Sequence, residues 1–261
     1  MKKLGLIGGG NMGEAIIAGT HKKYKVSVCE ANATRASYLK KKYRVTVNDL
    51  TAVAKKSDVI ILAVKPQDFV EVLNRLTGIS LKGKIIVSIA AGITAAFIEE
   101  HLGKKVKVVR TMPNMPALIG EAITAVCQGK FASAQDVKTV CAILSGIGET
   151  VVVKENQMDA ITATSGSGPA YVFLFVECFV NAAKSLGLSP AQAKDLVYKT
   201  LTGSVHLLEK AGDDAATLRA KVTSKGGTTQ AAMDVFWSNQ IEKIFVKALT
   251  AARNRARELA K

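Results

Sequence analysis

The sequence predicts an α/β protein with two parts: an N-terminal, Rossmann-type, doubly wound, mostly parallel sheet, followed by an all-helical C-terminal domain. Short β-branched runs alternate with amphipathic stretches up to residue 154, and buried strands that alternate with helices are typical of parallel sheets. Beyond residue 154 no strand pattern remains, and the chain becomes alanine-rich. We therefore expect one domain over residues 1–154 and a second over residues 155–261.

The expected elements follow from local patterns. Strands are predicted where apolar, β-branched runs are short, at residues 4–7, 26–29, 45–47, 59–62, 85–88, 106–109, 123–126 and 151–153. Amphipathic stretches between them cover residues 33–42, 67–76 and 134–143. The second half should form helices over residues 157–187, 190–211, 214–222, 228–239 and 240–260. Ser189 and Pro190 mark one helix start, because serine caps a helix and proline suits its first position.

Composition and charge narrow the class of protein. An apolar fraction of 48% is enough for packed cores. The net charge of +15 comes from scattered basic pairs without interleaved aromatic residues, so we expect no nucleic-acid surface. The apolar run 170–180 is interrupted by Glu177 and is too short to span a membrane, so we expect a soluble protein. Four cysteines without CxxC or metal-ligand spacing indicate free thiols in a reducing cytoplasm and no metal site.

A glycine motif follows the first expected strand. In LGLIGGGNMGEAI, Gly8, Gly10 and Gly13 form a GxGxxG pattern that opens a helix. The first glycine permits a tight turn, the second lets the backbone approach a pyrophosphate, and the third lets helix and strand pack closely. The anion would lie against the N–H groups of the helix N-terminus. The strand–turn–helix context predicts a dinucleotide site.

The identity of the dinucleotide stays open from the residues alone. Glu30 follows the second strand, where an acidic residue hydrogen-bonds the ribose 2′-hydroxyl of NADH. Asn32 and Arg35 lie just beyond it and could hold the 2′-phosphate of NADPH. Alternatively, Glu30 is only solvated and Arg35 only covers a helix face. We expect NADPH, with NADH as the alternative.

Three further loops follow predicted strands and so should lie at the carboxyl edge of the sheet, where such folds bind ligands. They are Ala63-Val64-Lys65-Pro66, Ala90-Ala91-Gly92, and the stretch 110–116, RTMPNMP, with Met112, Pro113 and Asn114. Two prolines three residues apart predict a stiff, extended loop that suits a wall against a nicotinamide ring. Pro66 could instead simply start a helix, and Lys65 could face water.

Two glycine-rich motifs interrupt the helical half, TSGSGPAY and VTSKGGTT. Glycine and proline inside helices cost about 1 and 3 kcal/mol relative to alanine, so such interruptions have a packing or functional reason. For Gly166, Gly168 and Pro169 that reason is either close helix approach or ligand contact. For residues 226–229, successive backbone N–H groups before a helix form a nest for an anion such as a carboxylate.

The motifs GGGNMG, AVKP, RTMPNMP, TSGSGPAY and VTSKGGTT, in this order and spacing, resemble those of pyrroline-5-carboxylate reductase from end to end. The resemblance implies reduction of Δ1-pyrroline-5-carboxylate to L-proline by a nicotinamide cofactor, the last step of proline biosynthesis. It also implies a dinucleotide-binding first domain and a substrate-binding, dimerising second domain. The expected assembly is a homodimer or a larger homo-oligomer.

The resemblance assigns residues to each ligand. At the cofactor, it implies that Gly8, Gly10, Asn11 and Met12 lie at the pyrophosphate, Asn48 near the adenosine, and residues 63–66 and 90–92 beside the nicotinamide. At the imino-acid substrate, it implies a carboxylate held by Ser224 and the amides of Gly226, Gly227, Thr228 and Thr229. It places the Thr229 hydroxyl and the acidic Glu155 near the ring nitrogen, with Thr229 and Ser224 as the catalytic pair.

One position departs from the family pattern. The family usually has proline between the serine and the two glycines, whereas this chain has Lys225. Losing proline loosens a loop in its unbound state. The lysine could add attraction for the substrate carboxylate or simply point outward.

Two other functions were weighed. A β-hydroxyacid dehydrogenase shares the domain order but would carry a catalytic lysine in its own motif and a DxPVSGG-like loop, neither of which this sequence contains. A non-enzymatic dinucleotide-sensing module would not need a donor-rich GGTT loop. The helix around 171–180 is apolar nearly all round and must be buried, which independently predicts at least a dimer.

Overall fold

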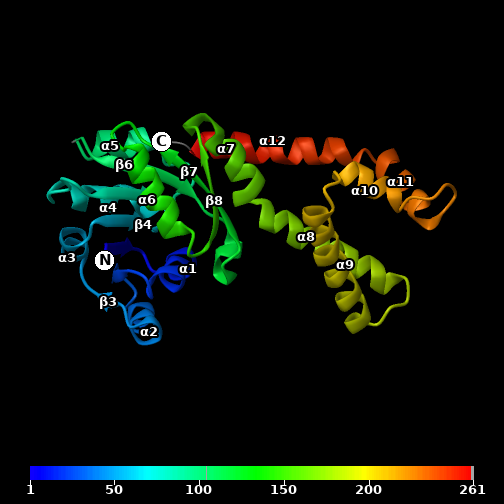
Figure 1. Cartoon of the computed structure of the whole chain (residues 1–261), viewed down its shortest axis with the longest axis horizontal. Helices are drawn as coiled ribbons and strands as arrows, with labels where there is room; N and C mark the ends of the chain where they lie inside the picture. Colours follow the sequence, from blue (N-terminus) through cyan, green and yellow to red (C-terminus); the bar gives the residue numbers. More distant parts are fainter. Residues whose placement is uncertain (104, 260–261) are drawn as a thin grey trace. The chain divides into compact units, whose positions relative to one another are not determined.

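The computed structural model describes residues 1–103 and 105–259. Within these residues, eight strands form one sheet in the order β3-β2-β1-β4-β5-β6-β7-β8 (Figure 1). The strands are β1 (Lys3–Ile7), β2 (Lys25–Cys29), β3 (Thr46–Val47), β4 (Val59–Leu62), β5 (Ile85–Ser88), β6 (Lys107–Met112), β7 (Ala122–Gln128) and β8 (Gly148–Val153). All neighbouring pairs are parallel except β6 and β7, which are antiparallel. The predicted doubly wound, mostly parallel sheet is confirmed.

The strand order predicts where the ligand crevice lies. The chain winds outward from β1 to β2 and β3, then returns to β4 on the other side of β1. In open α/β sheets, ligands bind outside the carboxyl ends of the strands at this point of reversal. The crevice is therefore expected beyond Ile7, Cys29 and Leu62, where the three central strands end.

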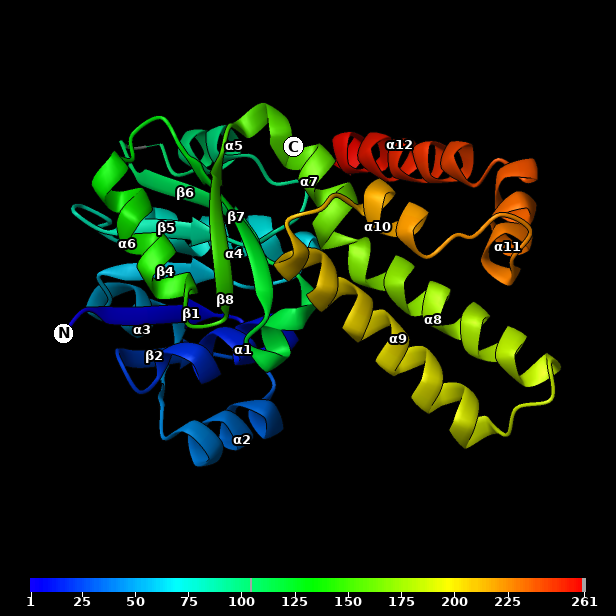
Figure 2. The same cartoon turned by 45° about the vertical axis from the view of Figure 1, so that its right-hand side comes forward.

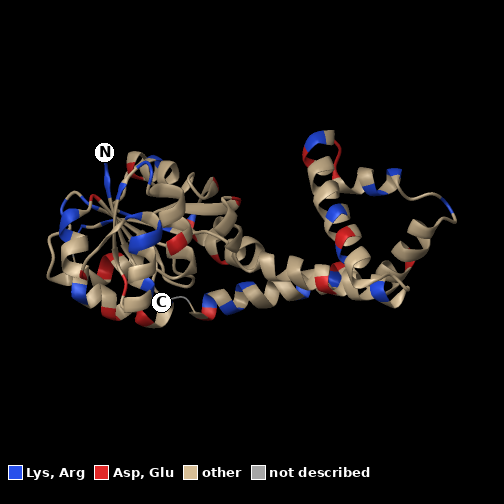
Figure 3. Ribbon diagram, turned by 90° about the horizontal axis from the view of Figure 1, so that it is seen from below, with Lys and Arg blue, Asp and Glu red and all other residues tan. Residues whose placement is uncertain are grey.

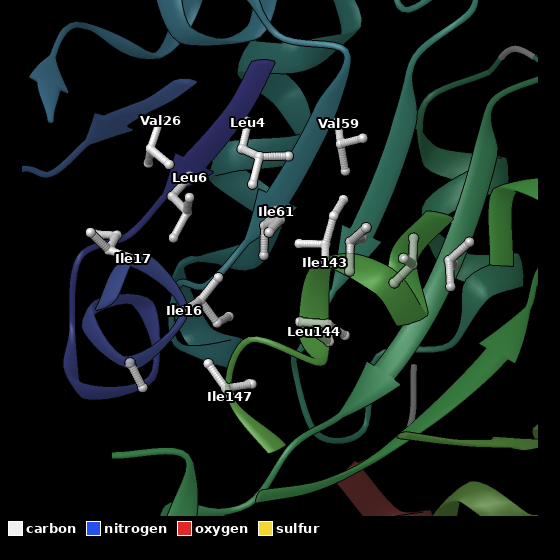
Figure 4. Close-up of a cluster of buried hydrophobic side chains, with 14 of the residues drawn as sticks. Leu4, Leu6, Ile16, Ile17, Val26, Val59, Ile61, Ile143, Leu144 and Ile147 are labelled. Carbon is white, nitrogen blue, oxygen red and sulfur yellow. The ribbon is translucent and has the colours of Figure 1, made fainter. Parts of the chain in front are cut away.

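Helices cover both faces of the sheet and form two cores. One face packs α1 (Asn11–Thr20), α2 (Ala33–Tyr43) and α6 (Ala134–Leu144) against β1, β2 and β4, with side chains such as Ile16, Leu39 and Ile143 (Figure 4). The other face packs α3 (Leu50–Lys56), α4 (Phe69–Thr77) and α5 (Ala95–His101), with Phe69 and Leu73 among its buried side chains. Burial on both faces explains why the central strands are continuously apolar.

The chain divides into two compact units. The first comprises Met1–Pro169 together with the C-terminal end from Ala251, and the second comprises Ala170–Thr250. The first unit contains η3 (Glu155–Gln157), α7 (Met158–Ile161) and a π-helical turn, Thr162–Gly166. The helical half contains α8 (Gly168–Ser185), α9 (Pro190–Ala211), α10 (Ala215–Lys221), α11 (Thr228–Ser238) and α12 (Ile241–Leu259). Figure 2 shows α8 and α9 as a helical hairpin. Buried Ala183 of α8 packs in one apolar cluster with Ala193 and Val197 of α9.

Five details differ from the sequence prediction. The strand predicted at 106–109 runs on to Met112, so Arg110, Thr111 and Met112 are strand residues rather than loop residues. Met115–Ile119 is a 3-10 helix, η2, rather than extended chain. The helix predicted at 157–187 is broken by the π-helical turn at 162–166. The stretch predicted at 67–76 begins as a 3-10 turn, η1 (Pro66–Asp68), and the helices α3 and α5 were not predicted.

The end of the last predicted helix, residue 260, lies outside the described residues. Among the described residues, none of the helices is long and apolar enough to cross a membrane. Basic side chains are spread over many elements with acidic ones among them (Figure 3).

Candidate functional site

The glycine loop after β1 has the geometry of a phosphate cradle. Gly8 has φ of 101°, and a Cβ there would lie 2.5 Å from the Ala63 carbonyl oxygen. A Cβ at Gly13 would collide with the Gly8 carbonyl, whereas Gly10 faces open space. Gly10 begins α1 without a side-chain cap, so the first amides of the helix are available to an anion. The tight turn at Gly8 and the close packing at Gly13 are as the sequence predicted, and the pyrophosphate contact at Gly10 stays a prediction.

A cavity of about 520 Å³ lies at the carboxyl edge of the sheet, next to this loop. It is walled mainly by the loops after β1, β2 and β4 and by η1 and α4, with lining residues that include Gly8, Gly10, Glu30, Ala63, Val64, Lys65, Asp68, Glu71 and Arg75. The first GxGxxG glycines, the residue after β2 and the AVKP loop thus meet in one space, as their positions after parallel strands predicted. Pro66 starts η1 directly beyond this wall.

A second cavity, of about 220 Å³, joins three motifs that are far apart in the sequence. Asn11 and Met12 come from the glycine motif, Pro113, Asn114 and Met115 from RTMPNMP, and Gly166 from TSGSGP. A Cβ at Gly166 would lie 2.6 Å from Cε of Met112. Gly166 thus packs closely on a side chain of β6 rather than on a neighbouring helix, and its contact with a ligand stays a prediction.

Glu30 and Arg35 occupy different places. The Glu30 carboxylate lines the 520 Å³ cavity and accepts hydrogen bonds from the amides of Gly9 (2.7 Å) and Asn32 (2.8 Å). The Arg35 guanidinium points to α1, where it donates to the Gly9 carbonyl (2.7 Å) and pairs with Glu14 (2.5 Å). The side chain of Asn32 caps α2 by accepting from the Arg35 amide.

Glu14 is the centre of a network that the sequence reasoning missed. Its carboxylate receives donors from Arg35, Tyr38, Lys42 and Tyr43. Partial burial alone would raise the pKa of Glu14, but the hydrogen bonds outweigh it and lower the pKa to about 2. Every donor lies on α2 and the acceptor on α1, so only the amphipathic spacing of α2 could have hinted at the network.

A second charged cluster lies where the first unit ends. Arg110, in β6 and only 3% exposed, pairs with Glu155 at 2.7 Å. The same carboxylate accepts from the Cys127 thiol (3.1 Å). Burial first, and then the Glu155 hydrogen bond and charge, raise the pKa of Cys127 to about 12. Glu155 keeps 39% of its side chain exposed despite these contacts.

The TSKGG loop in the helical half makes a tight turn before α11, in which the Gly227 amide donates to the Ser224 carbonyl at 3.0 Å. Gly226 has φ of 71°, a conformation that other residues adopt only with strain. A Cβ at Gly227 would collide with the Ser224 hydroxyl. Gly227 begins α11 without a side-chain cap, so the amides of Thr228 and Thr229 point out of the helix start. Lys225 is exposed in this loop.

Some predicted cofactor residues lie elsewhere. Asn48 follows β3 and donates its amide to Val28, beside the end of β2, but it does not line either cavity. Ala90 and Ala91 follow β5, and Gly92 (φ 73°) packs against Leu259, where a Cβ would lie 2.7 Å from the Leu259 carbonyl. Among the described residues, no group of three His, Cys, Asp or Glu could hold a metal ion.

Comparison with known proteins decides the family. A family model described as pyrroline-5-carboxylate reductase dimerisation matches residues 155–259, and one described as NADP oxidoreductase, coenzyme F420-dependent, matches residues 3–92. The pyrroline-5-carboxylate reductase of Corynebacterium melassecola is 35% identical over 100% of both chains. That of Synechocystis is 37% identical over 99% of this chain and 98% of its own. This chain belongs to the pyrroline-5-carboxylate reductase family.

Solved structures of the family have the same fold. A pyrroline-5-carboxylate reductase from Coxiella burnetii is 35% identical and superposes with a TM-score of 0.91 over 100% of this chain and 99% of its own. The pyrroline carboxylate reductase of Plasmodium falciparum, solved with NADP bound, is 31% identical with a TM-score of 0.90 over 100% and 98%. The resemblance drawn from the five motifs is confirmed.

Proposed function

We propose that this protein reduces Δ1-pyrroline-5-carboxylate to L-proline with a hydride from NADPH or NADH, as the last step of proline biosynthesis. The observation that carries the proposal is the end-to-end similarity to relatives named for this reaction, at 35% and 37% identity. Membership of this family favours the reductase over the dehydrogenase and sensing alternatives. The four free cysteines and the biosynthetic role support a cytoplasmic location.

The residues of the first unit fit a dinucleotide. The tight turn at Gly8 and the open space beside the backbone of Gly10 suit a pyrophosphate, which Asn11, Met12 and Gly13 would help to hold. Residues 63–66, 90–92 and 112–114 are proposed to flank the nicotinamide half, and Asn48 the adenosine. When bound, the reduced nicotinamide supplies the hydride.

The loop before α11 is proposed to hold the substrate. The amides of Gly226, Thr228 and Thr229 and the Ser224 hydroxyl would donate to the substrate carboxylate, as an uncapped helix start favours. The Gly227 amide, which was also predicted to contact the carboxylate, instead donates to the Ser224 carbonyl at 3.0 Å. The Thr229 hydroxyl would hydrogen-bond the ring nitrogen. A protonated imine is already electrophilic, so orientation of this ring can carry most of the catalysis without a strong acid. Glu155 is assigned to the substrate by the resemblance, and its 39% exposure supports access to a ligand.

The Thr229 assignment is tested by Thr229→Ala and Thr229→Ser. Alanine removes the hydroxyl, so we expect turnover to fall at least about 10-fold while the dissociation constant of the nucleotide stays unchanged. Serine keeps the hydroxyl and should retain most of the turnover. Unchanged turnover in the alanine variant would refute the role of this hydroxyl.

We further propose that the protein forms a homodimer, or a larger assembly of dimers, through the helical half. The exposed apolar side chains of α8 include Val172 (57%), Phe173 (57%), Leu174 (60%), Phe175 (44%) and Phe179 (40%). So much exposed apolar surface marks an interaction site, and the dimerisation model matches this half of the chain. Light scattering should give at least twice the mass of one chain, and a stable monomer would overturn the proposal.

A further inference from the structure

We propose that the dinucleotide cavity selects NADH over NADPH, with Glu30 as the residue that accepts the ribose 2′-hydroxyl. The inference rests on the proposed function, because it requires a dinucleotide in this cavity. It goes beyond that function by naming the cofactor and the residue that selects it.

The Glu30 carboxylate is held at the cavity wall at the end of β2. One oxygen accepts from the Gly9 amide at 2.7 Å and the other from the Asn32 amide at 2.8 Å. A carboxylate oxygen can accept more than one hydrogen bond, so each oxygen keeps acceptor capacity for a ligand hydroxyl. The two amides fix the carboxylate before any ligand arrives. A carboxylate preorganised in this way suits a ribose hydroxyl and repels a phosphate.

Arg35, the residue that could have held a 2′-phosphate, is engaged elsewhere. Its Nε donates to the Gly9 carbonyl, and its Nη2 pairs with Glu14. The guanidinium also lies 5.2 Å from the centre of the Tyr38 ring. Glu14 holds four donors, and Arg35 is not among the residues that line the cavity. The Nε and Nη2 groups of Arg35 are thus both directed at partners away from the cavity wall.

The charge of the cavity wall points the same way. Three carboxylates line it, those of Glu30, Asp68 and Glu71, against two cations, Lys65 and Arg75. The pyrophosphate common to both cofactors is served by the glycine loop and the start of α1. The 2′-phosphate of NADPH would therefore lie against a cavity wall that has more acidic than basic side chains.

The test is isothermal titration calorimetry of NADH and NADPH into the intact protein, without substrate. A hydrogen bond to a carboxylate typically corresponds to about 10- to 100-fold in affinity, so NADH should bind at least about 10-fold more tightly than NADPH. Equal affinities, or tighter NADPH, would overturn the inference while leaving the proposed reductase intact. If neither nucleotide bound, the inference and the proposed function would fail together.

Three variants test which residue sets the ratio of the NADH and NADPH affinities. Glu30→Gln removes the charge with little change of shape, and should move the ratio of the two affinities at least about 10-fold toward NADPH. Arg35→Gln should weaken both nucleotides by a similar factor, because Arg35 supports the Gly9 carbonyl. Glu71→Gln removes a charge from the same wall without removing the proposed acceptor, and should move the ratio much less than Glu30→Gln does.

Three results would contradict this assignment. The ratio could stay fixed in Glu30→Gln with the fold intact by circular dichroism. Arg35→Gln could weaken the binding of NADPH without weakening that of NADH. Glu71→Gln could move the ratio as far as Glu30→Gln does, which would assign the selection to the general charge of the wall.

Discussion

Replacing Glu155 by glutamine should destabilise the protein through Arg110. The Arg110 guanidinium is 3% exposed, and its one ion-pair partner among the described residues is Glu155, at 2.7 Å. Glutamine keeps the shape and one acceptor but removes the negative charge. A buried cation without its counter-charge is costly, because water cannot reach it.

The structure sets the size of the effect. Removing one partner of a fully buried pair costs about 3 to 5 kcal/mol. Glu155 is 39% exposed, so solvent already screens part of this interaction. We therefore expect a loss of about 1 to 2 kcal/mol, which corresponds to roughly 5 °C in the melting temperature of a chain of this length.

The assay is thermal and urea unfolding at fixed protein concentration, with Glu258→Gln as the matched control. Glu258 pairs with Arg255 at the same distance of 2.7 Å, but both side chains are more than 60% exposed, so its loss should cost under about 0.5 kcal/mol. Cys127 adds a second readout, because Glu155 helps to raise the pKa of its thiol, and this pKa should fall in Glu155→Gln. Equal destabilisation by the two variants, with an unchanged thiol titration, would refute the reasoning.

Three further results are expected. Thr124→Val should stabilise the protein by about 1 kcal/mol in urea unfolding, because its buried hydroxyl has no hydrogen-bond partner among the described residues. Thr111→Val should destabilise the protein by a similar amount, because it removes a 2.9 Å hydrogen bond, and the same sign for both variants would contradict this reasoning. Because the folded pKa of Glu14 is lowered to about 2, the stability that this carboxylate contributes is complete above the unfolded value of 4.5 and is lost as the pH falls toward 2. In acid unfolding, Glu14→Gln should therefore reduce the loss of unfolding free energy over this pH range by about 1 to 2 kcal/mol. An unchanged pH profile would count against the network. Gly226→Ala and Gly187→Ala both put alanine at a positive φ in open space, so each should lower the free energy of unfolding by about 1 kcal/mol. Only Gly226→Ala should raise KM for the imino acid. A matching rise of KM in Gly187→Ala would show a global effect.

Local patterns predicted most of the fold. The apolar strands and the GxGxxG glycines were located correctly, because their burial on both faces and their close backbone approaches require those residue types. The start of α11 after Gly226 and Gly227 was also predicted correctly from two glycines before a helical pattern. Each of these features depends on residues that are close together in the sequence.

Features that depend on distant partners were not predicted. Strand β6 seemed to end before Arg110, because a lone charged residue does not indicate burial until Glu155, 45 residues away, is known to pair with it. The π-helical turn at 162–166 interrupts a stretch whose composition favours a continuous helix. The short helices α3 and α5 have seven residues each, too few for a clear period. The Glu14–Arg35 pair likewise joins two helices.

The most direct test of the central claim follows the absorbance of the reduced nicotinamide when Δ1-pyrroline-5-carboxylate is added to the protein, with L-proline measured in the same sample. The account predicts that the cofactor is consumed and that proline appears in equal amount, at least with NADH. Nucleotide binding without cofactor consumption or proline formation would contradict it, and would mean that the loop with Lys225 serves another imine.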